Sequence, residues 1–140
     1  MTKISRFKLS SEQIHQLNQR MISAVASLRE KKALNLFFDD LLTMTEKIML
    51  GKRLLIALLL ERGYSYGAVS VLMKVSQGTI HAVSTRLQKG GTGFRLAIKN
   101  LEKEEKIEHT LEKVFVSFGK LAKPLTSKTS AGYYQRKQHN

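Results

Sequence analysis

The stretch SYGAVSVLMKVSQGTIHAVSTRL, residues 65–87, decides the fold of this chain. Ser65 and Ser76 each precede a short apolar segment, and serine is a preferred residue at the N-terminus of a helix. This spacing predicts one short helix from Ser65 to about Met73 and a second from Ser76 to about Gln88. Two short helices joined by a tight turn form a helix-turn-helix.

The apolar residues of both predicted helices recur at steps of three and four, which gives each helix one inward face. The residues expected to face inward are Val69, Leu72, Met73, Ile80, Val83 and Leu87. Val75 is expected to fill the turn, and Ser70 supplies the small residue that the helix crossing requires. Lys74 stands where glycine is common in such turns. Because positive φ is uncommon for other residues, a turn of different shape is the alternative.

The outward side of the second predicted helix carries short or polar residues, namely Gln77, Gly78, Thr79, His81, Ala82, Thr85 and Arg86. Side chains of this kind let a helix approach base edges in the major groove of DNA. Gln77 is suited to adenine, Thr79 and Ala82 to a thymine methyl group, and His81 to a guanine acceptor.

Phosphate contacts are predicted at the rim of this helix. The residues expected there are Lys74, Ser76, Arg86 and Lys89. Tyr66 is also expected to contact DNA. The alternative is an ordinary helical hairpin inside an all-α bundle. No acidic residue occurs between Glu61 and Glu102, and this absence favours a polyanionic partner.

Helical spacing continues on both sides of the motif. A helix capped by Ser10 or Ser11 is predicted to run to about Leu28, and a second apolar segment ends near Thr43. Thr43 followed by Glu46 is typical of a capping box that opens a third, central helix, which Gly63 ends. Gly90–Gly93 is predicted to be a flexible joint rather than a phosphate-binding loop, because no Gly-Lys-Ser/Thr follows it.

The chain after this joint is also predicted to be helical, as far as residue 119. The charged segment EKEEK, residues 102–106, is either an exposed helix face or a break. The predicted organisation is therefore a basic N-terminal arm (1–9), an all-α DNA-binding and dimerisation domain (10–119, with the helix-turn-helix at 65–88) and a disordered basic tail (120–140). The tail carries five basic residues and no acid.

Composition narrows the class of function further. Of 140 residues, 24 are Lys or Arg and 11 are Asp or Glu, so the net charge of +13 favours nucleic acid. With no cysteine, disulfides, iron–sulfur clusters and thiol nucleophiles are excluded. The four histidines lack metal-ligand spacing, and the adjacent Asp39 and Asp40 point about 100° apart on a helix. We therefore expect no enzyme activity, cofactor or metal.

No sequence feature indicates a membrane partner or secretion. The longest apolar run, Leu54–Leu60, is too short to span a bilayer, and the first residues lack the apolar region of a secretory signal. A cytoplasmic, nucleoid-associated location is predicted.

Three stretches together carry a resemblance to a known family: FFDDLLTMTEKIMLGKRL (37–54), ERGYSYGAV (61–69) and VSQGTIHAVSTRLQKG (75–90). Over roughly residues 15–101 the chain resembles the Trp repressor-like superfamily, and within it the YerC/YecD family of small bacterial DNA-binding proteins. The resemblance implies an all-helical, intertwined homodimer that presents two recognition helices to successive major grooves. Independently, Phe37, Phe38 and the predicted central helix hold more apolar surface than one chain readily covers.

The resemblance also bears on a tryptophan corepressor. Arg53 falls on the first of the two arginines that hold the indole in the Trp repressor, and Thr43 falls on a corepressor-contacting threonine. Ala82 takes the place of the second arginine and Val83 that of a glycine. We therefore expect a vestigial pocket at Thr43 and Arg53 that does not bind tryptophan. The alternative role for Arg53 is a salt bridge to Asp39, Asp40 or Glu46.

The favoured hypothesis is thus a homodimeric, sequence-specific regulator that binds double-stranded DNA and resembles a repressor. One alternative is an RNA-binding or ribosome-associated basic module, which the charge alone would serve equally well. Another is a helical adaptor whose apolar face binds a different protein.

Overall fold

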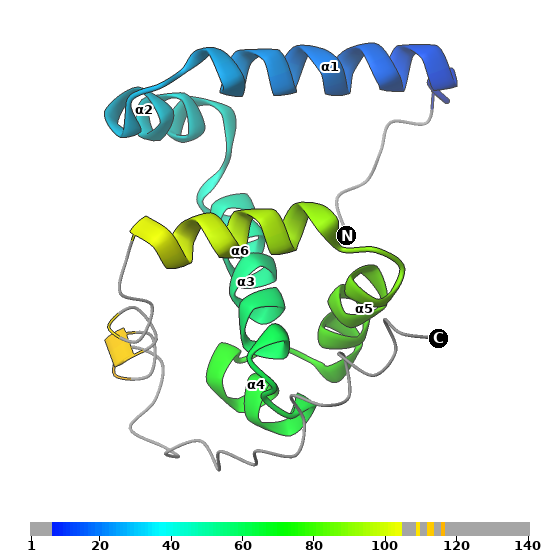
Figure 1. The fold of residues 1–140 in the computed structure, drawn as a ribbon. Coiled ribbons are helices and arrows are strands. Elements are labelled where there is room, and N and C mark those ends of the chain that lie inside the picture. Colours follow the sequence, from blue (N-terminus) through cyan, green and yellow to red (C-terminus); the bar gives the residue numbers. More distant parts are fainter. Residues whose placement is uncertain (1–6, 105–108, 110–111, 114–115, 117–140) are drawn as a thin grey trace. The chain divides into compact units, whose positions relative to one another are not determined.

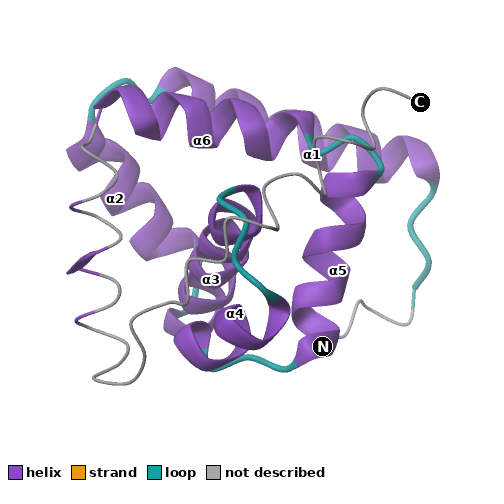
Figure 2. Cartoon of the chain, turned by 60° about the horizontal axis from the view of Figure 1, so that its bottom comes forward, coloured by secondary structure: helices purple, strands orange, loops and turns teal. Residues whose placement is uncertain are grey.

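The computed structural model describes residues 7–104, 109, 112–113 and 116. This part of the chain forms six helices and no strand, which confirms the predicted all-α class (Figures 1 and 2). The predicted basic tail, most of the predicted N-terminal arm and the end of the 102–106 segment lie outside the described residues. The chain divides into two compact units, Met1–Lys47 and Ile48–Asn140.

The N-terminal unit contains α1 (Ser11–Ser27) and α2 (Lys31–Leu41). Of the two serines predicted to cap this helix, Ser10 and Ser11, Ser10 is the one that does so. The Gln13 backbone N–H donates to the Ser10 hydroxyl at 3.1 Å, and the Ser10 N–H donates to the Gln13 side chain at 2.9 Å. No residue of either helix is buried, so the apolar stripes of α1 and α2 remain largely open to solvent.

The third helix, α3 (Met44–Glu61), begins with the predicted capping box. The Thr43 N–H and hydroxyl both donate to the Glu46 carboxylate at 2.8 Å, and the Glu46 N–H donates to the Thr43 hydroxyl at 3.3 Å. These bonds favour the ionised carboxylate. The backbone bond, followed by the hydroxyl bond, therefore lowers the pKa of Glu46 below its ordinary value of 4.5.

The C-terminal unit is built around the second half of α3, with α4 (Tyr66–Met73), α5 (Gln77–Gln88) and α6 (Thr92–Glu104) beside it (Figure 1). Five consecutive residues of α3, Ile56–Leu60, are at most 3% exposed. Successive residues on a helix point about 100° apart, so five buried in a row mean that this level of α3 is covered on every side. The predicted central position is therefore confirmed for this half of the helix.

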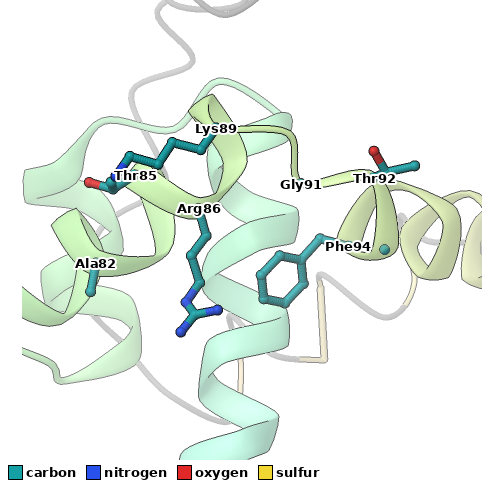
Figure 3. Close-up of a pocket in the computed structure, with 8 residues that line it drawn as sticks. Ala82, Thr85, Arg86, Lys89, Gly91, Thr92 and Phe94 are labelled. Atoms are coloured by element: carbon teal, nitrogen blue, oxygen red, sulfur yellow. The ribbon is translucent and has the colours of Figure 1, made fainter. Parts of the chain in front are cut away.

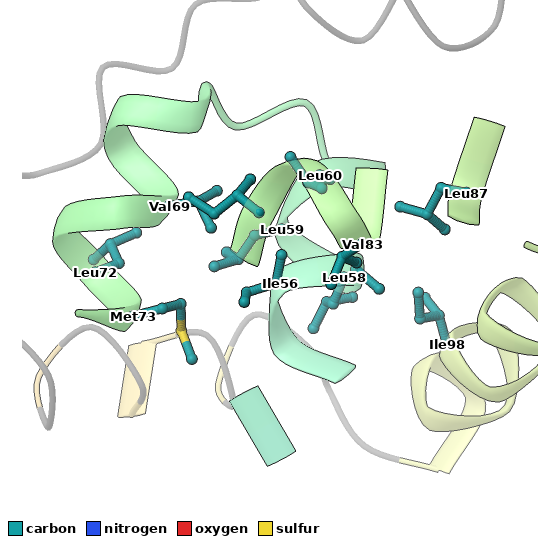
Figure 4. Close-up of a cluster of buried hydrophobic side chains, with 12 residues drawn as sticks. Ile56, Leu58, Leu59, Leu60, Val69, Leu72, Met73, Val83, Leu87 and Ile98 are labelled. Carbon is teal, nitrogen blue, oxygen red and sulfur yellow. The ribbon is translucent and has the colours of Figure 1, made fainter. Parts of the chain in front are cut away.

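The core of this unit brings residues from four helices together (Figure 4). Besides Ile56–Leu60, its buried members are Val69, Leu72, Met73, Ile80, Val83, Leu87 and Ile98. The predicted end of α3 at Gly63 is also confirmed. Gly63 has φ 86°, and the next residue, Tyr64, returns a backbone hydrogen bond of 3.0 Å to the Leu59 carbonyl.

The joint between α5 and α6 is shorter than predicted. Thr92 and Gly93 already belong to α6, so Lys89, Gly90 (φ 146°) and Gly91 (φ 60°) form the connection. The Arg95 side chain of α6 connects α6 to the end of α5 and to the joint. It donates to the Gly90 carbonyl and, at 3.1 Å, to the Leu87 carbonyl, and it pairs with the Glu61 carboxylate at 3.1 Å.

Gly91 is required by both its backbone angle and its surroundings. A Cβ atom at this position would lie 2.8 Å from the Leu87 Cα. We predict that Gly91→Ala lowers the free energy of unfolding by about 2 kcal/mol, because the left-handed conformation and the clash both oppose it. The measurement is urea unfolding followed by circular dichroism.

Gly93 provides the matched control two residues away. It lies in α6 with no positive φ, and a Cβ there would meet nothing within 4 Å. Gly93→Ala is expected to raise the free energy of unfolding by up to about 1 kcal/mol, because alanine is the better helix former. Equal effects of the two substitutions would contradict this account of the joint.

Candidate nucleic-acid interface

The turn between α4 and α5 has the left-handed geometry that is typical of a helix-turn-helix. Lys74 has φ 50° and ψ 56°, so the alternative of a differently shaped turn is wrong. Lysine is tolerated there because the turn is fixed on both sides. The Val75 N–H donates to the Ser70 carbonyl at 3.3 Å, and the Ser70 hydroxyl donates to the Val75 carbonyl at 2.8 Å.

This second role of Ser70 was missed by sequence reasoning, which predicted only that the residue must be small. The hydroxyl bridges five residues of sequence and ties the end of α4 to the residue before the α5 cap. Serine and threonine commonly bond to nearby backbone groups, but the sequence alone does not indicate which carbonyl is within reach.

The inward faces of the two helices agree with the prediction. All six residues expected to point inward are at most 4% exposed, and Val75 packs against the same core. Ser76 caps α5, since the Thr79 N–H donates to its hydroxyl at 3.3 Å, and Ser65 caps α4 through the Ala68 N–H at 3.2 Å. The helix-turn-helix is thus fixed by burial on one side and by capping at both helix starts.

The opposite side of α5 is open to solvent. Most of the predicted DNA-contacting residues are exposed there, namely Gln77, Gly78, Thr79, His81, Ala82, Arg86 and Lys89, with Lys74 and Ser76 exposed at the turn. Thr85 is half-buried. The Thr79 and Ser76 hydroxyls lie 3.1 Å apart and pair with each other, which leaves the Thr79 methyl group for a partner. Tyr66 is half-buried and packs partly against the core.

Positive charge around this face is not neutralised. Among the described residues, Lys74, Arg86 and Lys89 form no ion pair. The acids that bracket the motif in sequence are engaged elsewhere, Glu61 with Arg95 and Glu102 with Arg62 at 2.6 Å. A face of this kind attracts phosphate groups.

Lys52 is a further cation at this face that sequence reasoning did not single out. Its ammonium group donates to the Lys74 carbonyl at 3.5 Å, which places it beside the turn. The two residues are 22 positions apart in the chain and share no motif, so only the packing of α3 against the turn reveals the contact.

A cavity of about 720 Å³ lies beside the start of α5. It is lined by Leu50, Arg53, Leu54, Ser76, Gly78, Thr79, Ala82, Val83, Arg86 and Phe94. The residues that the resemblance placed around a ligand position, Arg53, Ala82 and Val83, therefore do meet at one cavity. Arg86 also lines this cavity, which the resemblance had not indicated.

Within its own unit, Arg53 pairs with none of the described acids. The alternative ion pair with Asp39, Asp40 or Glu46 involves acids of the other unit and stays a prediction, and Asp39 pairs with Lys47 at 2.6 Å inside that unit. Thr43, the other predicted pocket residue, uses its hydroxyl to cap α3. The predicted loss of tryptophan binding stays a prediction.

Comparison with known proteins decides the family. Residues 15–114 match the family described as Trp repressor protein, which covers the helix-turn-helix and the segments on both sides. The chain belongs to the Trp repressor family. The chain is also 29% identical over 98 residues to the uncharacterized protein YerC of Bacillus subtilis (strain 168). The match covers 70% of this chain and 90% of that protein. No solved structure matches the chain.

Membership in the Trp repressor family indicates helix-turn-helix DNA binding and regulation. It also confirms the predicted resemblance and the all-α, Trp repressor-like fold. In the described part of the chain, no helix has the length and apolar character that a membrane span requires. The same residues contain no group of three His, Asp or Glu side chains that could hold a metal ion.

The left-handed Lys74 gives a direct test of the turn. We predict that Lys74→Gly raises the free energy of unfolding by about 1 kcal/mol, because glycine adopts positive φ without the steric cost of a side chain. DNA affinity should fall at the same time if the ammonium group contacts a phosphate. Urea unfolding and fluorescence anisotropy with a labelled duplex measure the two effects.

Lys74→Ala separates the two contributions. It removes the same charge but keeps a Cβ in the left-handed conformation, so it should lose DNA affinity without the gain in stability. If Lys74→Gly and Lys74→Ala were equally stable, the strain assigned to this turn would be wrong.

Proposed function

We propose that this protein is a homodimeric, sequence-specific regulator that binds double-stranded DNA through α5 and requires no tryptophan corepressor. The observation that carries the proposal is the exposed, acid-free side of α5 on a helix-turn-helix whose other side is fully buried. Its site of action would be the nucleoid in the cytoplasm. The proposal is not an enzymatic one, in keeping with the Trp repressor family.

The roles of the residues follow from their places on α5. The start of the helix carries the base-reading edge, which consists of Gln77, Gly78, Thr79, His81 and Ala82. Gly78 has no side chain, so the helix backbone can come close to a base pair there. Lys74, Ser76, Arg86 and Lys89 would position the helix through phosphates, with Thr85 and Tyr66 as half-buried neighbours.

The homodimer is supported by apolar side chains that the monomer leaves open. In α1, Ile14, Leu17, Met21 and Ile22 are between 48% and 57% exposed. Leu36 and Leu41 in α2 and Met44, Ile48 and Leu50 in α3 are exposed to a similar degree. Burial of this much apolar surface against a second copy would be favourable, since full burial of a large side chain contributes about 1.5–3 kcal/mol and each of these half-exposed side chains would contribute roughly half of that.

Base reading is tested with the preferred duplex from a genome-wide DNA selection with the purified protein. Gln77→Ala is expected to weaken binding to that duplex by about 1–3 kcal/mol and to change binding to random DNA little, because a base contact is lost and phosphate contacts are kept. Gln19→Ala is the matched control, since Gln19 is an exposed glutamine on α1. Equal losses on both duplexes would remove Gln77 from the base-reading edge.

Binding measurements with the selected duplex also decide whether the partner is DNA or RNA. With about six phosphate contacts, the logarithm of the affinity should fall with the logarithm of salt concentration at a slope near −5. Structured RNA that competes as well as the selected duplex would replace the proposal with the RNA-binding alternative.

The dimer is tested at the apolar stripe of α1. Leu17→Glu should shift the protein from dimer to monomer in sedimentation equilibrium and weaken DNA binding, because it places a charge in the apolar contact. Gln19→Glu introduces the same carboxylate about 160° away around the helix and should leave the dimer intact. A wild-type protein that sediments as a monomer would contradict the proposed assembly.

A further inference from the structure

We propose that the groove between the end of α5 and the start of α6 binds the sugar–phosphate backbone of DNA, as a contact separate from the base-reading edge. The groove is a cavity of about 860 Å³ whose side-chain lining is Ala82, Thr85, Arg86, Lys89, Thr92 and Phe94 (Figure 3). The inference rests on the proposed function and adds a second DNA-binding element, the first turn of α6.

The groove continues directly from the base-reading edge. Residues 82, 85 and 86 of α5, and Lys89 directly after the helix, follow one another at helical spacing and form a single stripe. Ala82 is shared between this stripe and the base-reading edge. A helix whose first turns lie in the major groove would therefore bring its last turns, and the groove beside them, toward the strand that borders the major groove.

The side chains divide the groove into a polar opening and an apolar wall. Figure 3 shows Arg86 extending from α5 beside the ring of Phe94, while Lys89 lies back along α5 toward Thr85. Thr92 is exposed at the start of α6, and Phe94 is half-buried against the core. The opening thus offers cations and hydroxyl groups, and the wall offers an aromatic ring and the methyl group of Ala82.

The positive charge of the groove has no partner within the described residues. Arg86 and Lys89 form no ion pair, and Glu61 and Glu102 are occupied by Arg95 and Arg62. Self-repulsion between unpaired cations costs energy unless an anion joins them. The charge pattern therefore favours an anionic occupant.

The shape of the groove is fixed before any ligand binds. Gly91 brings the backbone of the joint against Leu87, and the Arg95 guanidinium bonds the Leu87 carbonyl at 3.1 Å. The last turn of α5 and the first turn of α6 are thereby held together. A preformed groove binds with less loss of conformational entropy than one that must be ordered on binding.

The combination of groups fits a phosphodiester chain better than an isolated anion. Phosphate oxygens accept hydrogen bonds from guanidinium, ammonium and hydroxyl groups, and deoxyribose presents apolar C–H surface to an aromatic ring. A free phosphate ion would use the cations and leave the ring without a contact. Because such a contact reads no base, it should strengthen binding to all duplex sequences alike.

The test replaces Thr92 in the full-length protein once with an acidic residue and once with a basic residue. Thr92→Glu should weaken binding to a labelled random duplex about tenfold at low salt, and Thr92→Lys should strengthen it about threefold. An acid stabilises the first turn of a helix and a base destabilises it, so the expected changes in affinity are opposite in sign to those in stability. Misfolding therefore cannot produce the expected pattern, and thermal unfolding of each variant verifies this.

Asn100→Glu is the matched control, since it adds the same residue to an exposed position eight residues further along α6. It should change affinity less than twofold. If Thr92→Glu and Thr92→Lys both bind like Asn100→Glu while the wild-type protein binds duplex DNA, the groove is not a DNA contact and the proposed function stands. If the wild-type protein binds no duplex DNA at all, the proposed function fails and this inference fails with it.

Discussion

The hydrogen bonds across the turn at Lys74 set the direction of α5, and the surface that α5 exposes to solvent depends on that direction. Ser70 uses both its carbonyl and its hydroxyl to hold Val75, and Lys74 takes the left-handed conformation that this geometry imposes. A lysine in this conformation costs roughly 1–2 kcal/mol. The cost is offset by the burial of Met73 and Ile80 on either side of the turn.

The charge distribution follows from how the few acids of the C-terminal unit are used. Glu61, the last residue of α3, pairs with Arg95 of α6, and Glu102 of α6 pairs with Arg62 just after α3. These pairs are partly exposed and contribute little to stability by themselves. Their consequence is electrostatic, because the cations around α5 and the turn are left without partners and the exposed side of α5 stays positive.

The two units differ in how far a single chain can complete them. Among the described residues, the C-terminal unit buries twelve hydrophobic residues in one core, whereas α1 and α2 bury none. Amphipathic helices without a buried face gain most of their stability from a partner. This contrast supports the view that the N-terminal unit serves assembly, while the C-terminal unit holds the elements that would meet DNA.

The sequence by itself determined the secondary structure, the inward residues of the helix-turn-helix and the family, because helical periodicity and capping are local properties that short stretches of chain express. It also indicated the exposed side of α5, since the polar residues of an amphipathic helix are those left after the apolar ones. Only the tertiary structure decided which distant groups meet. The contact of Lys52 with the Lys74 carbonyl, the ion pair of Arg95 with Glu61 and the meeting of Arg53 with Arg86 at one cavity all join residues far apart in sequence. Their spacing along the chain carries no trace of that proximity, because it is set by how α3, α5 and α6 pack together.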